Sequence, residues 1–219
     1  MQRTYGFVFV DGVPFSDASF TCQLLNRIGP IRETHYGGFY DFTADLAKAD
    51  TAYTNLALPP HTDTTYFSEP AGLQAFHLLE HERSPGDTSK QPLGGLTLLI
   101  DGFHAADVLR RTNPEAAHIL SVYRLPWHAS GNKGISITPD ELYPVFEHSR
   151  EQDDLIRVRW NNDDRGVVPF MKDFNPDQWY EAARAWNEIL EDQSMKFWVK
   201  LQPGRLLSMR ISPLKLIPQ

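Results

Sequence analysis

Cysteine is almost absent from this sequence, because Cys22 is the only one among 219 residues. A single thiol excludes an internal disulfide framework and a cysteine-rich zinc site, and it fits a reducing compartment. No apolar run is long enough to cross a bilayer, so we expect no membrane association. Positive charge is also scarce: the net charge is −7, with no basic stripe to neutralise phosphates, which argues against a nucleic-acid partner.

The N-terminus enters a strand-like pattern at once. Residues 5–10 are aromatic or β-branched and are followed by Asp11-Gly12. Neither a signal peptide nor an Arg- and Ser-rich transit peptide is visible before them. Cytoplasm and mitochondrial matrix therefore both remain open as locations.

Short strands and a few helices are expected along the chain. Strand patterns cover residues 5–10, 72–79, 96–101, 155–160, 196–201 and 205–209. Helical patterns cover a segment between Ser16 or Asp17 and Gly29, then residues 103–111, 114–121 and 176–192, with an exposed loop at 82–95. This order favours a mainly β fold with added helices, a double-sheet jelly roll.

One triplet has the chemistry of a metal site. Of eight histidines, only His61 has a carboxylate, Asp63, two positions later. In an extended segment these two side chains point to the same side and can reach one ion. Imidazole and carboxylate together suit iron(II), which two histidines and one carboxylate bind in non-haem oxygenases. The alternative is a surface histidine beside a turn-forming aspartate, since such triplets also arise by chance.

The surroundings of the triplet resemble a known family. Residues 50–67 read DTAYTNLALPPHTDTTYF, and residues 94–103, 159–165 and 197–207 read GGLTLLIDGF, RWNNDDR and FWVKLQPGRLL. In this order they resemble the iron(II)/2-oxoglutarate oxygenases of the trimethyllysine and γ-butyrobetaine dioxygenase group. The resemblance implies a double-stranded β-helix, with His61 and Asp63 as the first two iron ligands.

The activity that the resemblance implies is hydroxylation of N6,N6,N6-trimethyllysine at C3, the first step of carnitine biosynthesis. Iron(II) is the implied cofactor, 2-oxoglutarate the co-substrate, and L-ascorbate is expected to support activity. A homodimer is left open. The alternatives are a γ-butyrobetaine-type hydroxylase and a non-catalytic truncated isoform. A zinc hydrolase is disfavoured, because no general-base signature accompanies the triplet.

The resemblance also assigns binding residues. Thr97 matches a position that hydrogen-bonds the co-substrate, although a threonine is common in any strand. Tyr36, Tyr40 and Tyr53 match an aromatic cage for the quaternary ammonium, which aromatic faces attract by about 0.5–2 kcal/mol per contact. Tyr40 departs from the family's tryptophan. Core packing is the alternative role for these three tyrosines.

Three further residues are implied in substrate binding. Asp50 matches an acidic residue that pairs the substrate's α-ammonium, and it distinguishes trimethyllysine from γ-butyrobetaine, which has no such group. Asn161 and Asn162 match a pair near the substrate carboxylate. The alternative role of Asp50 is a turn or a helix cap, and that of Asn161 and Asn162 is a turn at the end of a strand.

The resemblance ends at Leu207. The family continues with a strand that carries the third iron-ligand histidine, whereas this sequence has no histidine after His148. We therefore expect residues 1–207 to form an oxygenase domain that lacks its last core strands, and 208–219 to form a divergent tail. On this view the chain holds two of three iron ligands and is possibly inactive.

Overall fold

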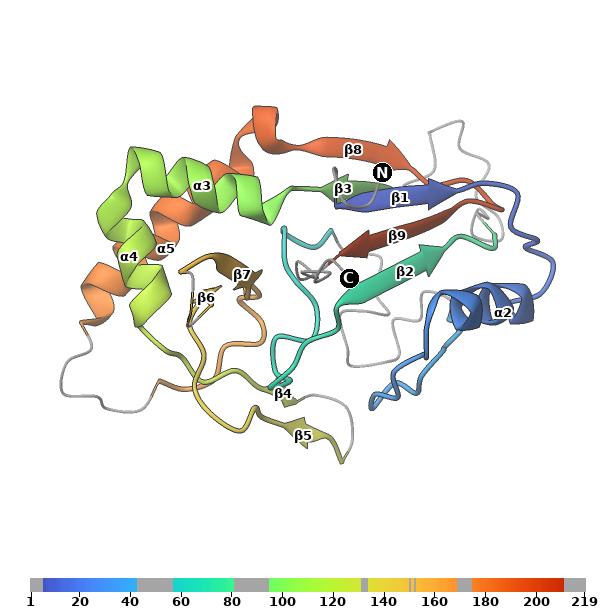
Figure 1. Cartoon of the computed structure of the whole chain (residues 1–219), viewed down its shortest axis with the longest axis horizontal. Helices are drawn as coiled ribbons and strands as arrows, with labels where there is room; N and C mark the ends of the chain where they lie inside the picture. The colour runs from blue at the N-terminus through green and yellow to red at the C-terminus, as the bar shows by residue number, and fades with distance from the viewer. Residues whose placement is uncertain are drawn as a thin grey trace, which may run out of the picture. The chain divides into compact units, whose positions relative to one another are not determined.

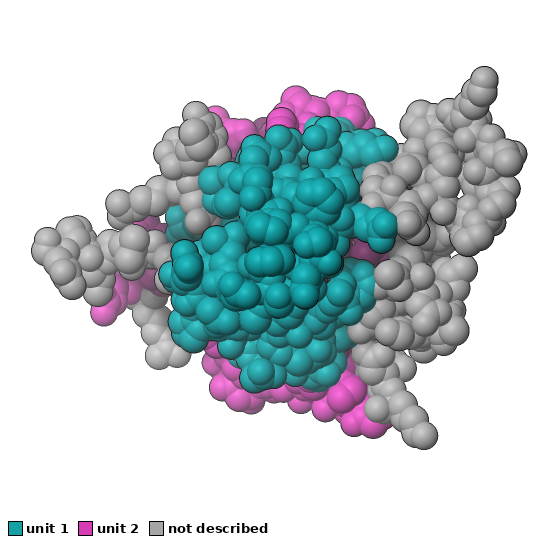
Figure 2. All heavy atoms as spheres, turned by 90° about the vertical axis from the view of Figure 1, so that its right-hand side faces the viewer, with its two compact units in different colours: residues 1–43, 73–99, 198–210 teal, residues 44–72, 100–197, 211–219 magenta. Residues whose placement is uncertain are grey.

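The computed structural model describes residues 6–42, 57–80, 95–130, 134–149, 151, 153–168 and 175–210. The chain divides into two compact units, which Figure 2 shows in different colours. Unit 1 comprises Met1–Thr43, Leu73–Leu99 and Trp198–Arg210. Unit 2 comprises Ala44–Gly72, Ile100–Phe197 and Ile211–Gln219. Both units combine segments that are far apart in the sequence, so long-range contacts define each of them.

A three-stranded antiparallel sheet forms the main layer of unit 1 (Figure 1). Its strands are β1 (Phe7–Val10), β2 (Leu73–His77) and β9 (Leu206–Arg210), with β9 in the centre. Ser208 pairs with Val8 on one side and with Ala75 on the other. All three predicted strands are confirmed. The boundary predicted at residue 207 falls inside β9, which continues through Ser208, Met209 and Arg210.

The remaining elements of unit 1 are one helix and a strand pair. Helix α2 (Ser19–Ile28) ends at Gly29 as predicted. Its N-cap is Ala18, which has no side-chain hydrogen bond, whereas the Asp17 carboxylate accepts from the Ser19 amide at 2.7 Å. The predicted capping role thus belongs to Asp17, one position early. Strand β3 (Leu96–Leu99) pairs with β8 (Phe197–Lys200).

Three helices form the larger part of unit 2. They are α3 (Gly102–Thr112), α4 (Pro114–Val122) and α5 (Pro176–Glu191), and α4 packs against the other two. The side chains of Asn113 and Asn175 accept from the first free amides of α4 and α5, and a proline follows each cap. Among the described helices, none is both long and apolar enough to span a bilayer.

The apolar face of α5 lies in the core of unit 2. Trp179 and Trp186 are 2% and 1% exposed, and the Trp186 ring meets Phe146 edge to face with centroids 5.0 Å apart. Phe146 begins β6 (Phe146–His148), which pairs with β7 (Leu155–Val158). The short elements β4 (Ala129–Ser130), β5 (Ser136–Ile137), β6 and the 3-10 helix η2 (Gln193–Met195) were not predicted, because two or three residues cannot display a periodic pattern.

The central position of β9 makes a prediction about Ser208. Proline at this position removes an amide from a strand that is paired on both sides and leaves a neighbouring carbonyl buried without a donor. We expect Ser208→Pro to lower the free energy of unfolding by at least about 2 kcal/mol, and Ser208→Thr to change it little. Urea denaturation measures both variants. Equal stability of Ser208→Pro and the unchanged chain would contradict this sheet order.

Candidate metal centre

His61 and Asp63 lie in an irregular segment of unit 2, between Pro59-Pro60 and a turn that begins at Asp63. Thr64 has a φ of 57°, in the left-handed region, which costs a residue with a Cβ about 1–2 kcal/mol. The turn is held because the Thr64 carbonyl accepts from the Phe67 amide at 3.0 Å and its hydroxyl accepts from the Ala71 amide at 3.2 Å. A β-branched residue is therefore kept in a strained conformation directly after the predicted metal ligand.

The structure brings the two predicted ligands together. His61 Nε2 lies 3.2 Å from Asp63 Oδ1, and the two side chains are 29% and 34% exposed. His61 Nδ1 lies 2.9 Å from the Pro59 carbonyl oxygen, which can only accept, so Nδ1 carries a proton. The nitrogen that faces Asp63 is then the one whose lone pair can bind a metal. Fixing the imidazole through its other nitrogen is the usual arrangement for histidine ligands, so the pair fits a metal such as iron(II).

The contact between His61 and Asp63 also favours the protonated imidazole. The hydrogen bond to Asp63 raises the pKa of His61 from 6.5 to about 9, against the opposing effect of burial. Nε2 therefore carries a proton at neutral pH and donates it to the carboxylate. Since a metal ligand must be deprotonated, binding of an ion below pH 9 releases that proton, and metal affinity increases as the pH rises toward 9.

A second carboxylate, Asp164, belongs to the same neighbourhood. Burial raises its pKa to about 6, and the negative charge of Asp63 acts in the same direction. The Thr65 hydroxyl donates to Asp164 Oδ2 at 2.5 Å, which opposes the shift. The sequence offered one signal for Asp164, its place in the quoted segment RWNNDDR, but the aspartates there were not singled out.

No group of three His, Cys, Asp or Glu side chains that could hold a metal occurs within the described residues. His148, the last histidine of the sequence, has its ring nitrogens directed elsewhere. Its Nε2 lies 3.3 Å from the Ser121 hydroxyl, and its Nδ1 lies 3.0 Å from the Asp153 carbonyl oxygen. The candidate centre in this part of the chain therefore consists of a two-ligand pair.

The predicted substrate residues are distributed over both units. In unit 1, the rings of Tyr36 and Tyr40 stack with centroids 5.5 Å apart and an interplanar angle of 22°. Rings this close leave no room for a trimethylammonium group between them, and each ring also contacts a further ring: His35 lies 3.9 Å from Tyr36, and Phe42 lies 5.1 Å from Tyr40, between centroids. Thr97 is half-buried in β3. Asp50 and Tyr53 lie outside the described residues.

Asn161 and Asn162 follow β7 in unit 2, the same unit as the metal pair. The Asn161 side-chain oxygen accepts from the Asp163 amide at 3.1 Å, the pattern of a turn-forming asparagine. Asn162 is exposed. The turn role that the sequence left open is thus present for Asn161, and the substrate role of both asparagines stays a prediction.

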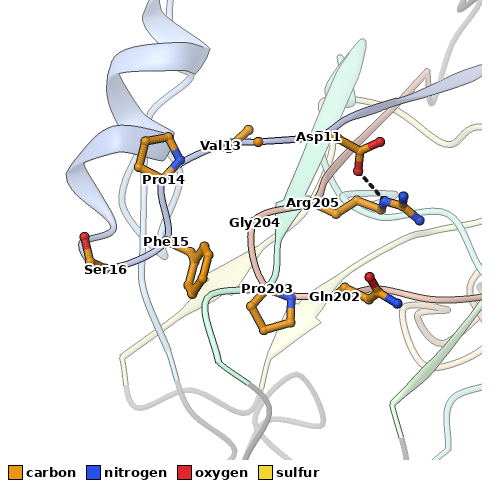
Figure 3. A pocket seen from close by; sticks show the side chains of 10 residues that line it. Asp11, Val13, Pro14, Phe15, Ser16, Gln202, Pro203, Gly204 and Arg205 are labelled. Carbon is orange, nitrogen blue, oxygen red and sulfur yellow. Dashed lines mark hydrogen bonds and ion pairs between the residues drawn. The ribbon is translucent and has the colours of Figure 1, made fainter.

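A cavity of about 400 Å³ occurs in unit 1 (Figure 3). It is lined by Asp11–Ser16 and Gln202–Arg205. Gly204 has a φ of +85°, and a Cβ there would lie 3.0 Å from the Phe15 ring, so glycine is required at this turn. Arg205 donates to Asp11 at 2.6 Å beside the cavity. None of the predicted site residues is among the lining residues.

Similarity to known proteins shows the family to which this chain belongs. The family model described as "Taurine catabolism dioxygenase TauD, TfdA family" matches residues 1–209. The chain therefore belongs to this family of dioxygenases. The PvcB protein from Pseudomonas aeruginosa, with which the chain shares 16% of residues, has a similar structure: the TM-score is 0.59 over 96% of this chain and 68% of PvcB. A TauD-like jelly-roll fold is thereby confirmed, while the predicted lack of the last core strands stays a prediction.

Within the family, the chain is most informatively compared with trimethyllysine dioxygenases. It is 54% identical to the enzyme of that name from Neurospora crassa, over 94% of this chain and 49% of the relative. It is 40% identical to "Trimethyllysine dioxygenase, mitochondrial" from Homo sapiens, over 93% of this chain and 46% of that protein. Identity to "Gamma-butyrobetaine dioxygenase" from Homo sapiens is 23%, over 85% of this chain and 46% of that protein. The chain spans about half the length of these curated relatives.

The geometry of the pair predicts how His61 titrates. In the metal-free chain, NMR should show the His61 ring losing its proton near pH 9. Asp63→Asn should move this pKa down toward 6.5, because the amide removes both the charge and the carboxylate acceptor. Asp163→Asn, a neighbouring change of the same kind, is the control and should leave it near 9. A His61 pKa that Asp63→Asn does not lower would contradict the observed pairing.

Proposed function

We propose that this chain carries the metal pair and part of the substrate pocket of an iron(II)/2-oxoglutarate dioxygenase that hydroxylates trimethyllysine at C3. The observation that carries the proposal is the His61–Asp63 pair, whose nitrogen and carboxylate converge within 3.2 Å. The 54% identity to the Neurospora crassa relative supports this substrate over γ-butyrobetaine, to whose dioxygenase the identity is 23%.

The iron ion would be held by His61 Nε2 and a carboxylate oxygen of Asp63. With 2-oxoglutarate and oxygen it supplies the oxidising chemistry, in which the co-substrate becomes succinate and carbon dioxide and one oxygen atom enters the C–H bond. The contribution of the chain itself is to hold the ion and to fix the substrate beside it. The partial exposure of both ligands allows small molecules to reach the ion.

Substrate binding in this proposal depends on charge. The trimethylammonium group cannot donate a hydrogen bond, so the faces of Tyr36, Tyr40 and Tyr53 would attract it by cation–π interaction. Asp50 would pair with the α-ammonium. Asn161 and Asn162 would bind the carboxylate with their amide groups.

The co-substrate and the cellular setting complete the proposal. Thr97 would donate its hydroxyl to 2-oxoglutarate, and ascorbate would support activity. Of the two locations that the sequence leaves open, a mitochondrial one accords with the word 'mitochondrial' in the name of the human relative. A homodimer and the cytoplasm stay predictions of the sequence alone.

The proposed function predicts a hydroxylase activity that is lost when His61 is replaced. The purified protein, supplied with iron(II), 2-oxoglutarate and ascorbate, should add one oxygen atom to trimethyllysine and release succinate only slowly, as measured by mass spectrometry, because the described residues offer the ion two ligands instead of three. His61→Ala should reduce this more than about 100-fold, because it removes a ligand rather than a supporting residue. Asp163→Ala, an exposed neighbour, is the matched control and should retain activity. Hydroxylation that survives His61→Ala would contradict the proposal.

The same assay separates the two substrates. Asp50→Asn should weaken trimethyllysine binding by about tenfold or more, since it removes a charged partner of the α-ammonium. On the γ-butyrobetaine alternative, the wild-type protein should instead hydroxylate γ-butyrobetaine faster than trimethyllysine, and Asp50→Asn should leave its activity intact. Binding of trimethyllysine without any turnover would favour the non-catalytic alternative.

A further inference from the structure

Thr62, the residue between the two metal ligands, makes three hydrogen bonds to one residue of the core, the longest from its hydroxyl to the Trp160 carbonyl at 3.5 Å. Its amide donates to the Trp160 carbonyl at 2.7 Å, and its hydroxyl oxygen accepts from the Trp160 amide at 2.9 Å. The arrangement is like a β-bridge in which the threonine side chain replaces its own carbonyl. Thr62 is thus tied to Trp160, while the side chains on either side of it, His61 and Asp63, face each other at 3.2 Å.

Trp160, to which Thr62 is hydrogen-bonded, is packed in the core of unit 2. Trp160 is 4% exposed, and its ring meets Trp186 of α5 edge to face, with centroids 6.3 Å apart at 84°. Trp186 is itself 1% exposed and packs on Phe146 of β6. Because Trp160 is buried and packs on Trp186, Thr62 cannot shift without disturbing the core or losing its hydrogen bonds.

The chain beyond the ligands is held by the residue next to Trp160. Arg159 is fully buried, and its guanidinium donates to the carbonyls of Thr65, Phe67 and Ser68 at 2.6 Å, 2.7 Å and 2.9 Å. Its remaining nitrogen pairs with the carboxylate of Glu147. Two consecutive residues after β7 thus hold the ligand segment at its middle and at its end.

We propose that Thr62 is a positioning residue for the metal pair and acts through its hydrogen bonds to Trp160. This inference rests on the proposed function, because it assumes that His61 and Asp63 bind a metal ion. Both ligands are on the surface and their own side chains are only partly buried, so their directions depend on the backbone between them. Removal of the Thr62 hydroxyl loosens that backbone, which then keeps only its amide bond to the Trp160 carbonyl, while the ligands stay present.

The test compares a Thr62 variant that loses the hydroxyl with one that keeps it. Thr62→Val keeps the shape of the side chain and the amide bond but leaves the Trp160 amide without its acceptor, whereas Thr62→Ser retains the oxygen. Asn113→Ala is the matched control: it removes one side-chain acceptor from one amide, that of Ala116, at the start of α4 in the same unit. Melting temperatures of all variants report the stability lost.

The measurement is a titration of each full-length variant with Co²⁺, followed by visible absorption, which reports affinity and coordination geometry without turnover. We expect Thr62→Val to weaken Co²⁺ binding about tenfold or more and to change the spectrum, as is typical when a supporting residue of a ligand is lost. Thr62→Ser and Asn113→Ala should bind Co²⁺ like the wild type, with the wild-type spectrum.

Each other outcome has a defined meaning. If His61→Ala abolishes Co²⁺ binding but Thr62→Val binds as the wild type does, the positioning role is wrong and the proposed function stands. Equal weakening by Thr62→Val and Asn113→Ala would show a merely structural role and overturn the inference. If the wild type binds no Co²⁺, or His61→Ala binds it equally well, the metal pair itself is refuted and the inference with it.

Discussion

A buried positive charge organises the part of unit 2 that carries the metal pair. Arg159 has no exposed surface, and an unpaired charge in such a place costs several kcal/mol. Its guanidinium is satisfied by Glu147 and by three carbonyls of the segment 65–68. Because these carbonyls belong to an irregular segment, satisfying the charge also fixes the backbone. The strained turn at Thr64 is retained between this segment and the contact of Thr62 with Trp160.

Much of the fold follows from local signals in the sequence. The caps Asn113 and Asn175 with the prolines that follow them place the starts of α4 and α5, because a cap acts within one turn. The pattern over residues 205–209 predicts strand β9 but not its central place in the sheet, because that place depends on pairing with β1 and β2, which lie far away in the sequence. Strand β6 has three residues and no pattern of its own, so only its partner β7 defines it.

The candidate site also contains residues that local sequence signals predict and residues that only long-range contacts reveal. His61 and Asp63 could be predicted because their spacing is local and the surrounding motif is specific, and the structure brings them together. The residues that support this pair could not be predicted. Arg159, Glu147 and Asp164 come from other parts of the chain, and no sequence spacing relates them to His61 and Asp63. The strand pattern around Arg159 suits an exposed arginine as well as a buried one, so the sequence does not show that this side chain is buried. Tyr36 and Tyr40 do lie together in unit 1, as the resemblance to the family implied they would, but as a stacked pair.

The central claim is that His61 and Asp63 together bind a metal ion. Crystals of the protein soaked with Mn²⁺, an ion that imidazole and carboxylate both accept, test it directly through anomalous scattering. The account predicts an anomalous peak about 2 Å from both His61 Nε2 and an Asp63 carboxylate oxygen, with the Nδ1 contact to Pro59 retained. A map with no peak between these two side chains, or with the ion bound only at other carboxylates, would contradict it.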